Sequence, residues 1–177
     1  TGTGSLEAST LAQTPNASLT GMTGEIGSTV TGGLSTMYKL QDTAGTSTTS
    51  TAGIGFGTVG SQEMVNNSSI QIIIVGGQCD MEDGARKNAY LGINWKWDST
   101  FSSTTDGSVD PCAYFVGTGS EVVKGGPCVG TIIKNTSGST KTLYFRPHIK
   151  STNASYTAVW GANATYYPIN YLITYLR

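Results

Sequence analysis

Charged side chains are scarce in this sequence. Asp, Glu, Lys and Arg make up 12% of its 177 residues, against about 25% in an average soluble protein. The net charge is −1, and the ten Lys and Arg residues are dispersed, so no basic patch is available to neutralise phosphates. The sequence therefore predicts no nucleic-acid partner.

Long apolar runs are also missing. The longest, residues 72–75, stops at Gly76-Gly77 and falls well short of the roughly 20 residues that a membrane-spanning helix needs. The chain begins at Thr1, without an initiator Met or a signal segment, which indicates processing or a partial sequence. We expect a protein that is soluble or displayed on a surface, with no membrane partner.

Cysteine is too rare for a dense disulfide framework. The three cysteines are an odd number, so at least one thiol is unpaired within the chain. Cys112 and Cys128 bracket a segment that suits a hairpin with its ends together, and this makes them the predicted pair if a disulfide forms. Buried thiols are the alternative, because Cys packs well as a small hydrophobe.

The single histidine gives little basis for catalysis. A Ser-His-Asp hydrolase needs a base oriented by a carboxylate, but the strand of His148 offers only Arg146 and Lys150 on the same face. No spacing typical of a zinc or nucleotide site occurs, and the acidic residues 80–83 are typical of a solvated turn. The sequence predicts no enzyme, no catalytic residue, no metal and no cofactor.

Gly, Ser and Thr dominate the start of the chain. Residues 1–35 contain isolated apolar side chains with no period of 3.6 or 2. We expect an extended N-terminal arm over 1–35, either disordered or docked on a neighbouring subunit. The length of the chain suits one domain, which we place at 36–177.

From Ile70 onward the apolar residues follow the period of β-strands. Residues 70–79 form a β-branched run typical of a buried strand, and residues 88–99 alternate. The strand 141–151 contains Pro147, which donates no hydrogen bond, so we expect an edge strand or a bulge there. About eight such strands, with no capped amphipathic helix, predict an all-β, antiparallel β-sandwich or jelly roll.

The last strand, residues 169–176, carries apolar side chains on both faces. Its tyrosines and isoleucines lie on one face and its leucines on the other. One face can enter the core of the sandwich. The other needs a cover, which in a small β-domain is often an identical subunit.

Residues 128–177 resemble the C-terminal strands of trimeric phage tail-fibre, spike and head-decoration modules with a TNF/C1q-like jelly roll. The shared pattern is a strand, a Ser/Gly turn, a long strand that ends near Asn153, a loop and a tyrosine-bearing final strand. The resemblance implies a homotrimer whose interface contains Tyr171, Ile173 and Tyr175. It also implies a structural or receptor-binding role at the virion surface, with other capsid or tail proteins as partners and a host-surface glycan as a candidate receptor.

Two other functions remain open. In a prokaryotic pilus or thread subunit, the arm would supply a strand to the next molecule of an extracellular, cell-surface filament by donor-strand exchange. In a secreted carbohydrate-binding module, Trp95, Trp97 or Trp160 would stack on sugars. For each tryptophan, packing in a core or an interface is the stronger interpretation.

Overall fold

Every regular element that the structure describes is a β-strand. The computed structural model describes residues 34–81, 87–117, 127–161 and 168–176, and these include no helix that could cross a membrane. All strand pairings are antiparallel. The strands are β1 (Leu34–Asp42), β2 (Thr46–Thr48), β3 (Ile54–Gly55), β4 (Gly60–Met64), β5 (Ser69–Gly76), β6 (Gln78–Met81), β7 (Lys87–Trp97), β8 (Ser108–Gly117), β9 (Cys128–Lys134), β10 (Lys141–Ser151), β11 (Ala158–Gly161) and β12 (Ile169–Leu176).

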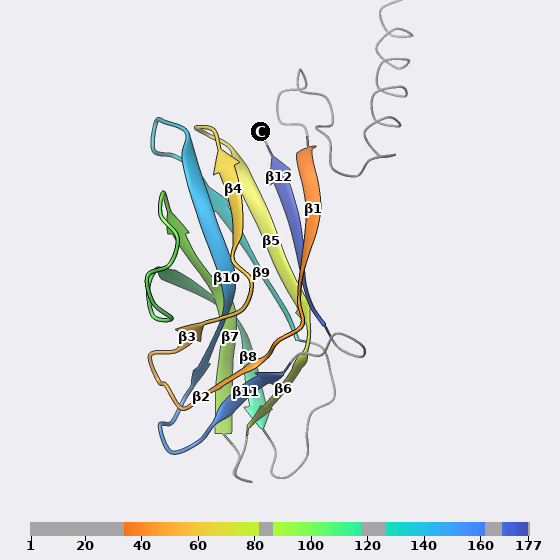
Figure 1. Ribbon diagram of the computed structural model, residues 1–177, viewed down its shortest axis with the longest axis vertical. Coiled ribbons are helices and arrows are strands. Elements are labelled where there is room, and N and C mark those ends of the chain that lie inside the picture. The colour runs from red at the N-terminus through yellow and green to blue at the C-terminus, as the bar shows by residue number, and fades with distance from the viewer. Residues whose placement is uncertain (1–33, 82–86, 118–126, 162–167, 177) are drawn as a thin grey trace, which may run out of the picture.

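Two facing sheets form the body of the molecule (Figure 1). The four-stranded sheet has the order β1-β12-β5-β9, and the five-stranded sheet has the order β3-β10-β7-β8, with β4 also paired to β10. Because β3 and β4 pair with successive parts of β10, they are two halves of one interrupted strand. Counted so, the two sheets contain strands 1-8-3-6 and 2-7-4-5, the order of a jelly roll. This confirms the predicted antiparallel β-sandwich.

A third, small sheet with the order β2-β11-β6 lies at the lower end of the sandwich in Figure 1. Its strand β6 follows β5 after a turn at Gly76 and Gly77, whose φ angles of 101° and 73° suit glycine. The predicted glycine stop of the 70–79 run is thus a turn between two sheets. The three strands of the small sheet come in addition to the eight positions of the jelly roll.

The core lies between the two main sheets because the strands alternate apolar and polar side chains. On β5, Ile70, Ile72 and Ile74 are fully buried. Burial of one such side chain stabilises the fold by about 1.5–3 kcal/mol. The alternation predicted for β7 also holds, since Leu91 and Ile93 are buried and Trp95 and Trp97 pack against the same core. The other buried members are Phe56, Met64, Cys79, Ala89, Val129, Ile133, Leu143, Phe145, Ile149, Ala158, Trp160, Ile169, Tyr171, Ile173 and Tyr175.

The prediction for Pro147 was wrong, because β10 is neither an edge strand nor bulged at this residue. It pairs with β7 on one side, in continuous register, and with β3 and β4 on the other. The Pro147 carbonyl accepts a hydrogen bond from the Phe56 backbone N–H, so the proline nitrogen faces the same side. That side is the gap between β3 and β4, where a missing donor leaves no ladder acceptor unpaired.

The predicted N-terminal arm lies outside the described residues except for its last two. Leu34 and Ser35 begin β1, which pairs with β12 along the edge of the four-stranded sheet. The arm itself stays a prediction.

Candidate functional site

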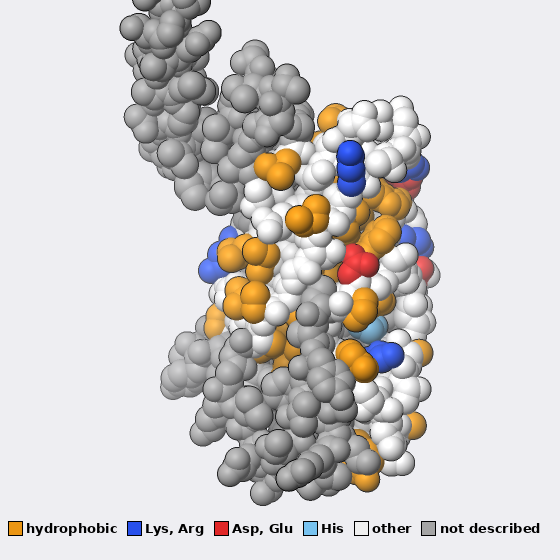
Figure 2. Space-filling view, turned by 180° about the vertical axis from the view of Figure 1, so that it is seen from behind, with side chains coloured by type: hydrophobic (Ala, Val, Ile, Leu, Met, Phe, Trp, Pro, Cys, Tyr) orange, Lys and Arg blue, Asp and Glu red, His pale blue; other side chains and the backbone are white. Residues whose placement is uncertain are grey.

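The outer face of the four-stranded sheet carries three exposed large apolar side chains. Leu172 and Leu176 of β12 are 44% and 38% exposed, and Ile132 of β9 is 68% exposed. The register places Leu172 beside Ile73 of β5, which is partly buried and points the same way. Figure 2 shows one face of the molecule, on which hydrophobic side chains lie among polar ones with scattered Lys, Arg, Asp and Glu side chains between them. We call Ile73, Ile132, Leu172 and Leu176 the apolar patch.

The three residues predicted for a trimer interface are not on this face. Tyr171, Ile173 and Tyr175 point into the sandwich and are 0%, 0% and 2% exposed within a single chain. The predicted alternation of β12 is correct, but its faces were assigned the wrong way round. Aromatic side chains fill more of the space between the sheets, and the face of β12 that carries the tyrosines is the one buried in the core. Any interface through β12 must use the leucines.

The outer face of the five-stranded sheet is polar and tightly bonded. Arg146 of β10 is 8% exposed, and its Nε donates to Asn94 Oδ1 at 2.8 Å. Its second guanidinium nitrogen donates to the Ser103 carbonyl at 2.6 Å, and its Cζ lies 3.8 Å from the centroid of the Phe101 ring. These contacts hold the β7–β8 loop over the sheet.

A second cluster, centred on the carboxylate of Asp106, also holds this loop in place. Asp106 accepts hydrogen bonds from Lys96 Nζ at 2.8 Å and from both the backbone N–H and the hydroxyl of Ser102. Lys96 first, then Ser102, lower the pKa of Asp106 well below its usual range. Asn94 completes the attachment, because its Nδ2 donates to the Asp106 carbonyl at 2.9 Å. The loop is therefore a fixed part of this face.

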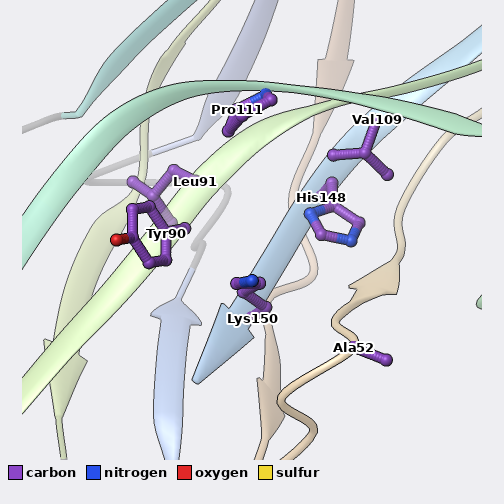
Figure 3. Close-up of a pocket in the computed structure, with 7 residues that line it drawn as sticks. All are labelled: Ala52, Tyr90, Leu91, Val109, Pro111, His148 and Lys150. Atoms are coloured by element: carbon purple, nitrogen blue, oxygen red, sulfur yellow. The ribbon is translucent and has the colours of Figure 1, made fainter. Parts of the chain in front are cut away.

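A pocket of about 360 Å³ lies on this face beside the clamped loop. Figure 3 shows its walls: His148 and Lys150 from β10, Tyr90 from β7, and Val109 and Pro111 from β8. Ala52 and Leu91 complete the lining. The side chains of His148 and Lys150 reach the pocket because residues two apart on a strand share a face.

His148 is a neutral, buried histidine. It is only 5% exposed. Burial, and then the charges of Lys150 and Arg146, lower its pKa from 6.5 to about 4. No carboxylate among the described residues forms an ion pair with it. The arrangement offers one hydrogen-bond donor and one acceptor but no oriented base for hydrolysis.

The cysteine predictions fall largely outside what is described. Cys79 is buried in the core beside the small sheet, and Cys128 is exposed on β9, where its thiol forms no disulfide with a described residue. The side chain of Cys112 lies outside the described residues, so the Cys112–Cys128 disulfide stays a prediction. The side chains of residues 80–83 also lie outside them.

All three tryptophans lie in the core or pack against it. Trp160 is fully buried, with its indole N–H donating to the Gly76 carbonyl at 3.0 Å. Trp95 donates to Asp110 Oδ2 at 3.1 Å and packs edge-to-face on Trp97 with centroids 6.2 Å apart. Trp160 lies in the core and Trp95 and Trp97 pack against it, in agreement with the core-packing interpretation, while the carbohydrate-binding module stays an untested alternative.

Comparisons with known proteins identify no family. No family model matches the chain, and no curated protein matches it. A chain in the structure of infectious bursal disease virus, strain Gx, is 12% identical with a TM-score of 0.37, covering 80% of this chain and 36% of that chain. A chain of the T13 viral particle of IBDV is 9% identical with a TM-score of 0.30, covering 80% of this chain and 39% of that chain. This chain thus spans less than half the length of either viral protein, and TM-scores this low carry no functional argument.

Proposed function

We propose that this chain is a structural protein of a virion surface and that it assembles there as a homotrimer. The single observation that carries the proposal is the apolar patch on the outer face of the four-stranded sheet. Exposed apolar side chains gathered on one face of a soluble domain mark a protein contact more often than a site of chemistry. Each copy presents the same patch, so a closed symmetric assembly covers it in every copy.

The interior of the sandwich supports a structural role over catalysis. Jelly rolls serve as viral capsid and lectin domains and as cupins. Here the described core between the sheets consists of aliphatic and aromatic side chains together with Cys79. We therefore propose a protein without enzymatic activity whose partners are its own copies and other capsid or tail proteins.

The proposal of three subunits is based on the sequence and not on the structure. The resemblance of residues 128–177 to trimeric virion modules favours a trimer over a dimer, with the final strand near the threefold axis. Because the tyrosine face of that strand is buried in the core, the exposed side chains Leu172 and Leu176 form the contact. The polar, clamped face of the other sheet then points away from the contact.

The donor-strand alternative has less support from the described residues. A subunit that receives a strand from its neighbour leaves a gap in its own sheet. Here β12 has β1 on one side and β5 on the other, both from the same chain. The core is thus complete without a strand from another molecule.

The test is the oligomeric state of the full chain and of one variant. We expect a mass three times that of the 18.4 kDa chain by light scattering and a monomer for Leu172→Asp, because a buried unpaired carboxylate is costly. Val59→Asp is the matched control, since Val59 is 39% exposed but belongs to the other layer. A wild-type monomer at micromolar concentration contradicts the trimer. Linear filaments in negative-stain images would favour the pilus alternative.

A further inference from the structure

The pocket on the five-stranded sheet holds an ammonium group with no carboxylate partner. Lys150 forms no ion pair with any described residue. Its Nζ lies 5.1 Å from the centroid of the Tyr90 ring, a cation–π distance that keeps the charge at the pocket. Arg146 lies four residues from Lys150 on the same face of β10, so the local field is positive. A ligand with one negative charge fits this wall.

His148 forms the floor and adds hydrogen-bonding capacity. Its ring is nearly buried, yet it makes no hydrogen bond with any described residue. A neutral imidazole carries one donor and one acceptor, and a sugar hydroxyl can serve both. The ring nitrogens of His148 are not among the described buried polar atoms that lack a partner, so solvent reaches them through the pocket, and a ligand hydroxyl would replace water there.

The third wall is apolar. Val109 is 36% exposed and, with Pro111, lines the side of the pocket contributed by β8. The pocket volume, about 360 Å³, is at the lower end of the range for small-ligand sites, which suits a monosaccharide. One cation, one hydrogen-bonding ring and one apolar wall together match the carboxylate, the hydroxyls and the C–H face of an acidic sugar.

We propose that this pocket binds a carboxylated monosaccharide of the sialic or uronic acid class. Lys150 pairs with the carboxylate, His148 bonds a ring hydroxyl, and Val109 and Pro111 contact the C–H face. The proposal goes beyond assembly, because the pocket is on the sheet opposite the apolar patch. The proposal assigns glycan binding to the outer face of the five-stranded sheet.

The test is saturation-transfer NMR on the full chain with N-acetylneuraminic acid. Its methyl ester is the uncharged matched probe, and N-acetylglutamate tests whether a peptide carboxylate is enough. We expect the acid to bind and Lys150→Met to weaken it by about tenfold or more, because a charge-assisted hydrogen bond is lost. Lys134→Met removes the same charge from the opposite sheet and should change nothing.

Three results with the wild type would overturn the proposal: no binding of the acid, equal binding of the ester, or equal binding of N-acetylglutamate. Persistent binding in Lys150→Met would do the same. The titration is repeated on Leu172→Asp, which carries an intact pocket. Binding there at wild-type strength separates the glycan site from the assembly proposal, so that either can fail alone.

Discussion

The protein should lose stability between about pH 7 and pH 5 because of one buried histidine. Burial beside two cations lowers the pKa of His148 from 6.5 to about 4 in the folded state. Between these values the unfolded chain binds a proton that the folded chain does not, so the free energy of unfolding falls as pH falls. Above pH 6.5 both states are neutral, and the full stability is present.

The size of the effect follows from the two pKa values. Each pH unit inside the window is worth about 1.4 kcal/mol, so acidification to about pH 5 costs about 2 kcal/mol. Solvent that enters through the pocket screens the ring and makes this an upper figure. Asp98 and Asp106 do not affect stability in this pH window. Lys141 and Lys96 lower the pKa values of these carboxyl groups below the usual 3.8, so their contributions to stability are lost only at lower pH.

The assay is chemical denaturation followed by tryptophan fluorescence at both pH values and one protein concentration. His148→Gln is the control, since the amide has a similar size and does not titrate. We expect the wild type to lose about 2 kcal/mol between about pH 7 and pH 5 and the variant to lose much less. Equal stability of the wild type at both values, or an equal loss in the variant, would refute the reasoning.

Three further predictions concern the described fold. Asn94→Ala should cost about 3 kcal/mol in chemical denaturation, because it leaves the neighbouring guanidinium Nε and two carbonyls without their side-chain partner; an unchanged midpoint would contradict this. Gly53→Ala should cost about 2 kcal/mol more than Gly138→Ala, because both have a positive φ but only the first Cβ meets the histidine ring; equal melting temperatures would exclude that contact. Deletion of residues 1–33 should leave the melting temperature unchanged, and a large drop would place the arm in the core.

The strands were predictable because their pattern is local. The alternation of β12 and the β-branched run of β5 follow from side-chain order alone, and both hold in the structure. The prediction for Pro147 was wrong because it depends on residues that are distant in the chain. Pro147 is tolerated in an inner strand only because the neighbouring strand on one side, formed by β3 and β4, is interrupted there. No property of residues 141–151 contains that information.

The candidate site was less predictable than the fold. The shared face of Arg146, His148 and Lys150 could be predicted, but the burial of His148 could not. It depends on Gly53, which lies against the ring, and on a loop that crosses the sheet. The interface residues were assigned to the wrong face because two apolar faces give no local rule for which one enters the core.

The position of the final strand affects how the chain is made. Among the described strands, β1 pairs only with β12, and β12 lies between β1 and β5. The first described strand therefore has no hydrogen-bonding neighbour until β12 has left the ribosome. Until then its unpaired edge is open to other nascent chains. The four-stranded sheet, and with it the apolar patch, can close only after β12 has been synthesised.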